Sequence, residues 1–458
     1  MTRAGSARWA PVTESHRAVA PDVLRGFAIF GVLVANTLTF AYPIASSPPD
    51  VPVWRGTGAA DAGVVLLVGL LVEGKFYSLL SVLFGMGLML QADRARTAGR
   101  PFTLFYLRRA AILFAIGVAH AVLLYAADIL AFYAIISVAA LPFRNLSPRR
   151  LATSALVCAC LGLATLSFYA WSHPARPYPG PADWSRMGQQ AESAPDFIER
   201  GASGVMDRLG VPRQGFYQTM ADEARVYRSG NWTELTRLRA ITALLLALPS
   251  KVILLGFWFL AFFLFGMFLV RGAAAGAHGD NSPPLPCFMR LDREALPTCR
   301  KLWYAGVPIG VVLMVVAGGV RAMLPGMVLT PSIYWAGTFG GVLLQAMGYA
   351  GGMLLLSARR PDGLVVRGLA AVGRTALSNY IAQSVVLGFV FYGTGLGLFT
   401  KLTALPVVAL SIPVFALLAW LSQVWLRGFT MGPIEWAWRC VTYGTRLPLR
   451  KPDAVAVP

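Results

Sequence analysis

The chain has 458 residues, of which 56% are hydrophobic and only 13% are charged, whereas a soluble domain carries about 25% charged residues. Its mean hydropathy of +0.60 excludes an ordinary soluble protein and indicates a chain that crosses the membrane several times. The net charge of +19 does not indicate binding to nucleic acid, because Lys and Arg form short clusters between apolar segments, as in the cytoplasmic loops of membrane proteins.

The first 21 residues contain no apolar segment of their own. The sequence therefore predicts no cleavable signal peptide, and the first membrane helix is expected to act as the insertion signal. The five cysteines include no Cys-x-x-Cys pair, and no His lies at the spacing of a metal ligand. We expect neither a disulfide framework nor a metal cofactor.

Apolar segments of about 20 residues predict transmembrane helices. Ten such segments follow one another, with approximate limits 24–44, 76–92, 108–126, 128–143, 151–172, 251–270, 302–322, 333–356, 369–392 and 403–426. An even number of crossings puts both termini on one side of the membrane, and the basic loops put that side in the cytoplasm. The predicted fold is an all-α, polytopic bundle of about ten helices in a lipid bilayer.

Two segments outside these helices have a structure of their own. Residues 57–73 are too apolar for a free loop, which predicts a half-helix or re-entrant segment on the outer side. Residues 173–239 contain a Pro-rich turn followed by stretches of mixed charge with helical spacing, which predict an amphipathic helical cap outside the cytoplasm. The chain then divides into a cytoplasmic tail (1–21), helices 1–5 with the candidate site (22–172), the cap (173–239), helices 6–10 (240–426) and a cytoplasmic amphipathic tail (427–458).

The first helix carries polar side chains that a lipid-facing helix does not need. Asp22 follows a proline, and Arg25 lies three residues later at ion-pair spacing, which is typical of a helix N-terminus. Asn36 lies about three turns beyond Arg25, on the same face and about 16 Å deeper. Two interpretations stay open for this face: a cleft that opens to the cytoplasm, or an interhelical hydrogen bond of Asn36.

His120 and Asp128 form the second polar group. His120 lies deep in the third predicted helix, and Asp128 lies in the outer turn that follows it. Eight residues separate them, about two helical turns, so both can face one cavity. A His paired with a carboxylate is the ordinary general base, but a His in an apolar helix is also often a hydrogen-bonded core residue, and both interpretations stay open.

Two more polar groups lie toward the C-terminus. Arg374 is expected at the cytoplasmic end of the ninth helix, where it can hold a phosphate or extend to lipid headgroups, and Asn379 lies a turn and a half inside. Glu435 and Arg439 have the spacing of a surface ion pair, with neighbouring Trp residues expected at the membrane interface. No Ser-His-Asp spacing, nucleotide-binding fingerprint or metal cluster is evident, so an enzymatic site would have to be assembled from several helices.

Seven sequence blocks identify the chain as a member of the YeiB family of bacterial integral membrane proteins. They run in family order from residue 17 to 439: "RAVAPDVLRGFAIFGVLVAN", "KFYSLLSVLFGMG", "LRRAAILFAIGVAHAVLLYAADILAFYA", "VYRSGNWTELTRLR", "FFLFGMFLVR", "VGRTALSNYIAQS" and "GPIEWAWR". This resemblance implies a multi-pass protein of the bacterial cytoplasmic (inner) membrane.

The YeiB family is more distantly similar to the trans-membrane acyltransferases, which include the family-three O-acyltransferases and the heparan glucosaminide N-acetyltransferases. The similarity lies in the first helix, where the shared frame is occupied here by Arg17, Asp22, Arg25, Gly26 and Asn36. The last position is His in the O-acyltransferases and Asn in the N-acetyltransferases. In the N-acetyltransferases a catalytic His follows the Asn on the next segment, whereas this chain has no His between Asn36 and His120. The chain also has Pro21 before Asp22, where those proteins have Leu.

This second resemblance implies about ten helices around a channel that acyl-CoA enters from the cytoplasm, while the acceptor arrives from outside. On this hypothesis His120 deprotonates the acceptor, Asp128 orients His120, and Asn36 holds the thioester carbonyl, while acyl-CoA binds at Arg25, Arg374 and Asn379. The alternatives are a small-metabolite transporter or exporter, in which His120 and Asp128 relay protons, and a structural or sensory protein whose cap binds a partner. The acceptor, either a cell-envelope group or a small molecule, the acyl chain and a homo-oligomeric state stay open.

Overall fold

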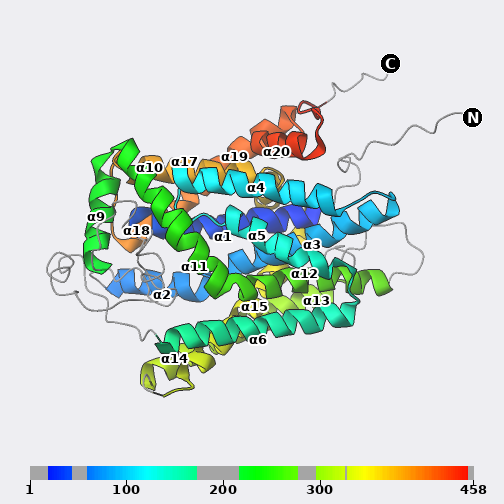
Figure 1. Ribbon diagram of the computed structural model, residues 1–458, viewed down its shortest axis with the longest axis horizontal. Helices are drawn as coiled ribbons and strands as arrows, with labels where there is room; N and C mark the ends of the chain where they lie inside the picture. Colours follow the sequence, from blue (N-terminus) through cyan, green and yellow to red (C-terminus); the bar gives the residue numbers. More distant parts are fainter. Residues whose placement is uncertain (1–18, 44–58, 173–215, 277–294, 325–326, 452–458) are drawn as a thin grey trace, which may run out of the picture.

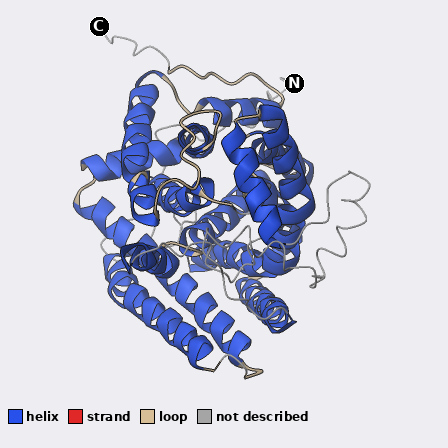
Figure 2. Ribbon diagram, turned by 90° about the vertical axis from the view of Figure 1, so that its left-hand side faces the viewer, coloured by secondary structure: helices blue, strands red, loops and turns tan. Residues whose placement is uncertain are grey.

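A computed structural model describes residues 19–43, 59–172, 216–276, 295–324 and 327–451. For residues 216–222 it describes the backbone only. Within these ranges all regular secondary structure is helical, and the only β-type pairing is an isolated bridge between Phe429 and Arg450. The predicted all-α bundle is confirmed (Figure 1). Figure 2, which looks at the end of the molecule that lies at the left of Figure 1, likewise shows only helices and loops in the described parts.

The helices of the described residues follow this order. They are α1 (Val19–Ala41), α2 (Ala59–Leu71), α3 (Lys75–Thr97), α4 (Thr103–Leu123), α5 (Leu130–Ala140), the 3₁₀-helix η2 (Leu141–Asn145), α6 (Pro148–Ser172), α9 (Phe216–Ser229), α10 (Trp232–Ile241), the π-helix η3 (Thr242–Ala247), α11 (Leu248–Ser250), the π-helix η4 (Lys251–Leu255), α12 (Gly256–Gly276), α13 (Ala295–Lys301), the π-helix η6 (Leu302–Gly306), α14 (Val307–Met323), α15 (Thr330–Arg359), α16 (Leu364–Arg374), α17 (Ala376–Phe391), α18 (Ala404–Ala409), α19 (Ser411–Gly428) and α20 (Pro433–Tyr443).

Ten apolar helical segments correspond to the ten predicted crossings. Eight of them in the described residues are long and apolar enough to cross a membrane, and the segments Leu130–Asn145 and Ala376–Phe391 are apolar but shorter. The ninth crossing differs from its prediction. Instead of one helix over 369–392, the chain ends α16 at Arg374 and starts α17 at Ala376, with the break at Thr375.

Helix α1 lies in the middle of the bundle and packs against α3, α15, α16 and α17. In the most apolar 18-residue stretch of α1, 78% of the residues are buried. The corresponding value for the segment Ala295–Met323, which lies at the periphery, is 17%. The α1 and α16 backbones approach closely because both carry glycine at the contact. A Cβ on Gly26 would lie 1.9 Å from the carbonyl oxygen of Leu369, and one on Gly373 would lie 1.8 Å from that of Asp22.

The bundle has two distinct ends, which lie toward opposite sides of Figure 1. At one end, where α1 starts and α16 ends, Arg374 Nη2 donates to the carbonyl of Thr430, just before α20; we call this the α20 end. At the other, the amide of Thr400 donates to the carbonyl of Ala41 and that of Gly393 to the carbonyl of Tyr227 in α9; we call this the α9 end. The α20 end therefore holds the described start of the chain and its last helix.

The α9 end contains the helices predicted outside the crossings. The amphipathic stretches of the predicted cap that lie in the described residues form α9 and α10, and Asn231 starts α10 by accepting from the amides of Thr233 and Glu234 at 3.1 and 3.3 Å. The rest of the predicted cap, 173–215, lies outside the described residues. The segment 57–73 contains a helix as predicted, α2, whose buried Asp61 accepts from the amide of Leu405 at 3.1 Å.

The long segment from α10 to α12 is not a regular α-helix. The π-helices η3 and η4 lie on either side of Pro249, which lacks the backbone N–H that a regular turn requires. The distortion occurs where this segment passes the turn between α4 and α5. Lys251, the first residue of η4, donates through Nζ to the carbonyls of Ala127 and Asp128, both at 2.7 Å.

Candidate functional site

His120 and Asp128 lie together, as their spacing predicts. His120 is in the last turn of α4, and its Nδ1 lies 2.9 Å from Oδ1 of Asp128. Both residues are only 4% exposed. A carboxylate at this distance accepts a hydrogen bond from the N–H of Nδ1, so it fixes the tautomer of the imidazole and leaves the Nε2 lone pair available as a base.

The turn that carries Asp128 is held from three sides. Its Oδ2 accepts from the amide of Ala131 in the first turn of α5 at 2.9 Å, and Lys251 binds the turn's carbonyls from η4. Gly117 of α4 allows the close approach, because a Cβ there would lie 2.3 Å from the nitrogen of Ala131. The carboxylate is therefore positioned by backbone contacts before any ligand binds.

A third group completes the arrangement. Nε2 of His120 lies 2.8 Å from Oγ of Ser384, which is in α17 and is 2% exposed. With Nδ1 protonated toward Asp128, Nε2 accepts a hydrogen bond from the hydroxyl of Ser384. Ser384, His120 and Asp128 form a Ser-His-Asp relay assembled from α17, α4 and the turn before α5.

The sequence did not reveal Ser384 as a site residue, because 264 positions separate it from His120. The available signal is weak: Tyr380 and Ser384 are four residues apart on a helix that also carries Asn379 and Gln383, so polar groups recur on one face. Tyr380 belongs to the same cluster, since its hydroxyl lies 3.4 Å from Oδ1 of Asp128 and its ring centroid 4.9 Å from that of His120.

Asn36 lies next to this relay without a direct bond to it. Its Oδ1 accepts from the hydroxyl of Tyr77 at 2.8 Å and lies 3.5 Å from that of Tyr125, which also contacts Thr39. The Tyr125 ring centroid is 6.3 Å from that of His120. Asn36 and His120 are therefore joined through Tyr125 in one buried polar cluster.

Gln383, beside Ser384, is an unusual member of α17. It is 2% exposed, and both Nε2 and Oε1 are buried without a hydrogen-bond partner among the described residues. An unsatisfied buried polar group costs about 1–3 kcal/mol. Such a group is explained when it serves a ligand or water that the bare protein lacks.

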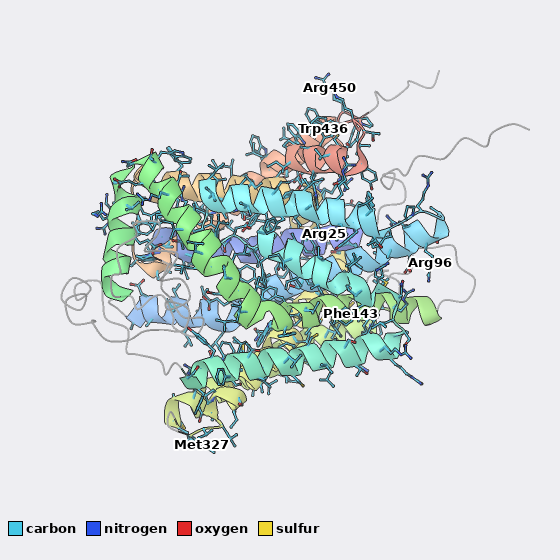
Figure 3. The ribbon with its side chains drawn as sticks, in the orientation of Figure 1. Arg25, Arg96, Phe143, Met327, Trp436 and Arg450 are labelled. Carbon is cyan, nitrogen blue, oxygen red and sulfur yellow. The ribbon has the colours of Figure 1, made fainter. Side chains whose placement is uncertain are left out.

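The predicted donor-binding residues lie nearer the α20 end. Arg25 Nη1 is 3.0 Å from Oδ1 of Asp22, which confirms the predicted pair, and its side chain is 37% exposed. Figure 3 places Arg25 on the same side of the bundle as Arg96, which lies in the last turn of α3. Arg374 binds the carbonyl of Thr430 at 3.1 Å.

No continuous polar face connects Arg25 to Asn36 along α1. The positions between them on that face, Ile29 and Val32, are apolar and buried. Asn379 is 4% exposed, and its nitrogen already donates to Oγ of Ser422 in α19, at 2.9 Å, and to both oxygens of Thr375. Asn379 thus has a role in packing α17 against α19, and its contact with acyl-CoA stays a prediction.

Glu435 differs from its interpretation as half of a surface ion pair. It is 7% exposed and accepts from the amides of Leu377 and Ser378, at 2.5 and 3.0 Å, and from the Ser378 hydroxyl at 2.5 Å. A carboxylate at a helix N-terminus is favourable both for the unpaired amides and for the helix dipole. Likewise Trp438 is not an interfacial anchor, because it is 9% exposed and lies under the guanidinium of Arg109 at 3.8 Å.

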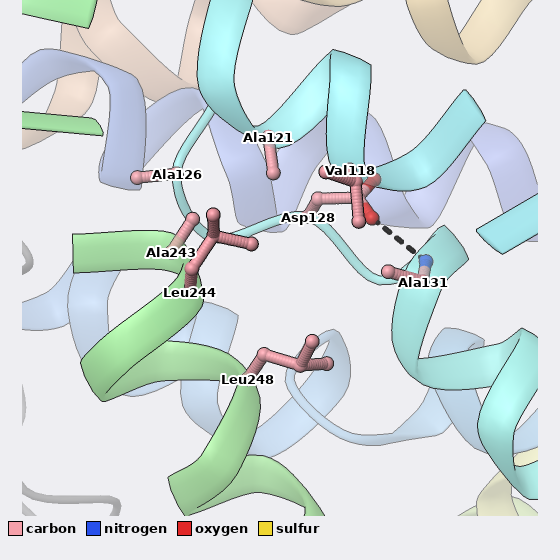
Figure 4. Close-up of a pocket in the computed structure, with 8 residues that line it drawn as sticks. All are labelled: Val118, Ala121, Ala126, Asp128, Ala131, Ala243, Leu244 and Leu248. Carbon is pink, nitrogen blue, oxygen red and sulfur yellow. Dashed lines mark hydrogen bonds between the residues drawn. The ribbon is translucent and has the colours of Figure 1, made fainter. Parts of the chain in front are cut away.

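Two cavities lie in the described parts of the bundle near charged groups. One of about 10 Å³, room for about one water, is lined by Asp128 together with Ala243, Leu244 and Leu248 (Figure 4). The other, of about 470 Å³, is open and basic, lined by Arg96 and Arg271 with Asn145 and Ser147. The described residues contain no group of His, Cys, Asp and Glu that could hold a metal ion.

Comparison with known proteins gives full-length relatives. A family described as "Protein of unknown function (DUF418)" matches residues 288–445. "Uncharacterized protein YxaH" of Bacillus subtilis is 28% identical over 97% of this chain and 99% of its own length. "Uncharacterized protein YeiB" of Escherichia coli is 26% identical over 93% of this chain and 96% of its own. No solved structure matches the chain.

Proposed function

Because the chain belongs to the YeiB-like family of integral membrane proteins, we propose that it is a membrane acyltransferase, which moves an acyl group from cytoplasmic acyl-CoA to an acceptor reached from the other side. One observation carries the proposal. A buried imidazole has a carboxylate on Nδ1 at 2.9 Å and a hydroxyl on Nε2 at 2.8 Å. This is the arrangement of a general base that activates a hydroxyl or amine for attack on an acyl group.

The remaining residues have roles that follow from their positions. Arg25 and Arg374, near the α20 end, attract the phosphates of CoA. Asn36 accepts a hydrogen bond through Oδ1 from Tyr77, so its nitrogen is the end that donates toward a thioester carbonyl. Arg25 and Asn36 are eleven residues apart on α1, about 16 Å, a distance that the pantetheine arm of CoA has to bridge between its phosphates and the reacting thioester.

The proposal is tested by measuring the transfer of a labelled acyl group. Membranes that contain the protein, incubated with radiolabelled acetyl-CoA, should transfer label to cell-envelope glycans, and His120→Gln should lower the initial rate by about 10²- to 10⁴-fold. His278→Gln, outside the described residues, is the matched control and should leave the rate unchanged. Transfer no faster than in membranes without the protein would contradict the proposal.

Transport of a small metabolite is the second candidate, and the same cluster favours it. The hydrogen-bonded series Ser384, His120, Asp128 and Tyr380 joins groups that can pass a proton through the bundle. Proton-coupled flux in proteoliposomes that His120→Ala abolishes, with no consumption of acyl-CoA, would support transport over acyl transfer.

A further inference from the structure

We propose that Ser384 is the catalytic nucleophile of this site and carries the acyl group as an ester between the donor and the acceptor. The inference rests on the proposed acyltransferase function and specifies its chemistry. It replaces direct transfer to the acceptor with two displacements through one serine.

The first support is the position of the hydroxyl. Oγ of Ser384 lies 2.8 Å from Nε2 of His120 and 3.3 Å from its other acceptor, the carbonyl of Tyr380. The shorter contact is the one through which the hydroxyl proton leaves. Since Asp128 binds the other ring nitrogen, Nδ1, the base is already oriented toward Ser384.

The second support is the neighbouring amide. If Ser384 only joined two helices, a hydrogen-bond partner for its own hydroxyl would be enough. Gln383, the residue before it, has both polar side-chain atoms buried and without a partner among the described residues. Its Nε2 is a buried donor without a partner among the described residues, and a preorganised donor is what an oxyanion requires. Gln383 and Ser384 are consecutive buried residues of α17, and we infer that the amide serves the carbonyl oxygen of the acyl group.

The first displacement is balanced within the cluster. Oγ of Ser384 attacks the thioester carbonyl while its proton moves to Nε2 of His120, and a C–O bond forms. The C–S bond then breaks, and the CoA thiolate leaves with the proton from Nε2. In the second displacement an acceptor hydroxyl or amine attacks the ester, His120 takes its proton, and Ser384 leaves with that proton restored to Oγ.

This order suits a site between two compartments. Ser384 lies eight residues beyond the start of α17 at Ala376, about 12 Å along the helix, so the donor's phosphates stay near Arg374 while the acyl group reaches the middle of the bundle. CoA can leave before the acceptor arrives. The two substrates then never need to occupy the buried cluster together.

The experiment uses two independent probes on the purified full chain in lipid nanodiscs. A fluorophosphonate, which labels activated serines whatever the acyl donor, should modify Ser384, and peptide mapping after incubation with acetyl-CoA alone should find an acetyl ester at the same residue. Ser384→Ala should abolish both, and His120→Gln should slow labelling at least about 100-fold. Ser384→Cys should instead accumulate a thioester at residue 384.

The matched control is Ser357→Ala, which removes another buried helical serine, bonded to the carbonyl of Met353 in α15; it should leave labelling and transfer unchanged. Acyl transfer at the wild-type rate in Ser384→Ala, without an ester, would overturn the nucleophile while the proposed function stands. Fluorophosphonate labelling of Ser384 without any consumption of acyl-CoA would support the nucleophile and contradict the proposed donor.

Discussion

At the scale of single residues, the site depends on how completely its polar groups are paired. His120 and Asp128 could be predicted because each is a titratable residue in an apolar stretch, where it needs a partner or a function. Ser384 could not, because serine is common in membrane helices and its partner is remote in sequence. The link between Asn36 and His120 also escaped prediction, since it passes through Tyr125, an aromatic residue with no distinguishing pattern around it.

The charge of Asp128 is expected to matter more for acyl transfer than the polar neighbours of this carboxylate. Asp128→Asn keeps the shape of the side chain but removes the charge that stabilises the imidazolium, so acyl transfer should fall by about 10²- to 10⁴-fold while the protein stays folded. Tyr380→Phe is the comparison, since its hydroxyl is 3.4 Å from the same carboxylate, and it should cost less than about tenfold. Equal effects of both variants in the rate assay would show that the charge is not what matters.

At the scale of elements, the site depends on how α17 is placed. Hydropathy predicted its existence, but its start at Ala376 is set by Glu435, which lies 59 residues after it and reaches its first amides from α20. The same is true of the turn before α5, which is fixed by Lys251 where a π-helical segment passes. Such contacts between distant helices leave no periodic pattern in the sequence, so helix positions can be predicted better than the joints between helices.

The cap that Glu435 provides at the start of α17 is expected to contribute to the stability of the protein. Glu435→Ala leaves two buried amides and the Ser378 hydroxyl without their acceptor, which should lower the free energy of unfolding by about 2 kcal/mol. Thermal denaturation in detergent measures it, with Glu234→Ala, an exposed glutamate of α10, as the control that should change the midpoint little. An unchanged midpoint in Glu435→Ala would show that α17 is positioned without this cap.

At the scale of the whole molecule, hydropathy and length account for the ten apolar helical segments of the described residues. They also account for the position of α20 at the same end as the described start of the chain. The polar cluster lies between that end and the α9 end, so on the proposed function a donor supplied on one side of the membrane is used in the interior of the bundle. The sidedness itself rests on the positive-inside rule. On the proposed function, this rule puts the arginines at the α20 end next to the cytoplasmic pool of acyl-CoA.

The most direct test is the release of free CoA from acetyl-CoA, which does not cross membranes, by oriented membrane vesicles. Inside-out vesicles, which expose the cytoplasmic face, should release CoA, right-side-out vesicles should not, and His120→Gln should abolish the release. Release from right-side-out vesicles alone, or release from inside-out vesicles that is equally fast without the His120 imidazole, would contradict a His120-dependent use of acyl-CoA from the cytoplasmic side.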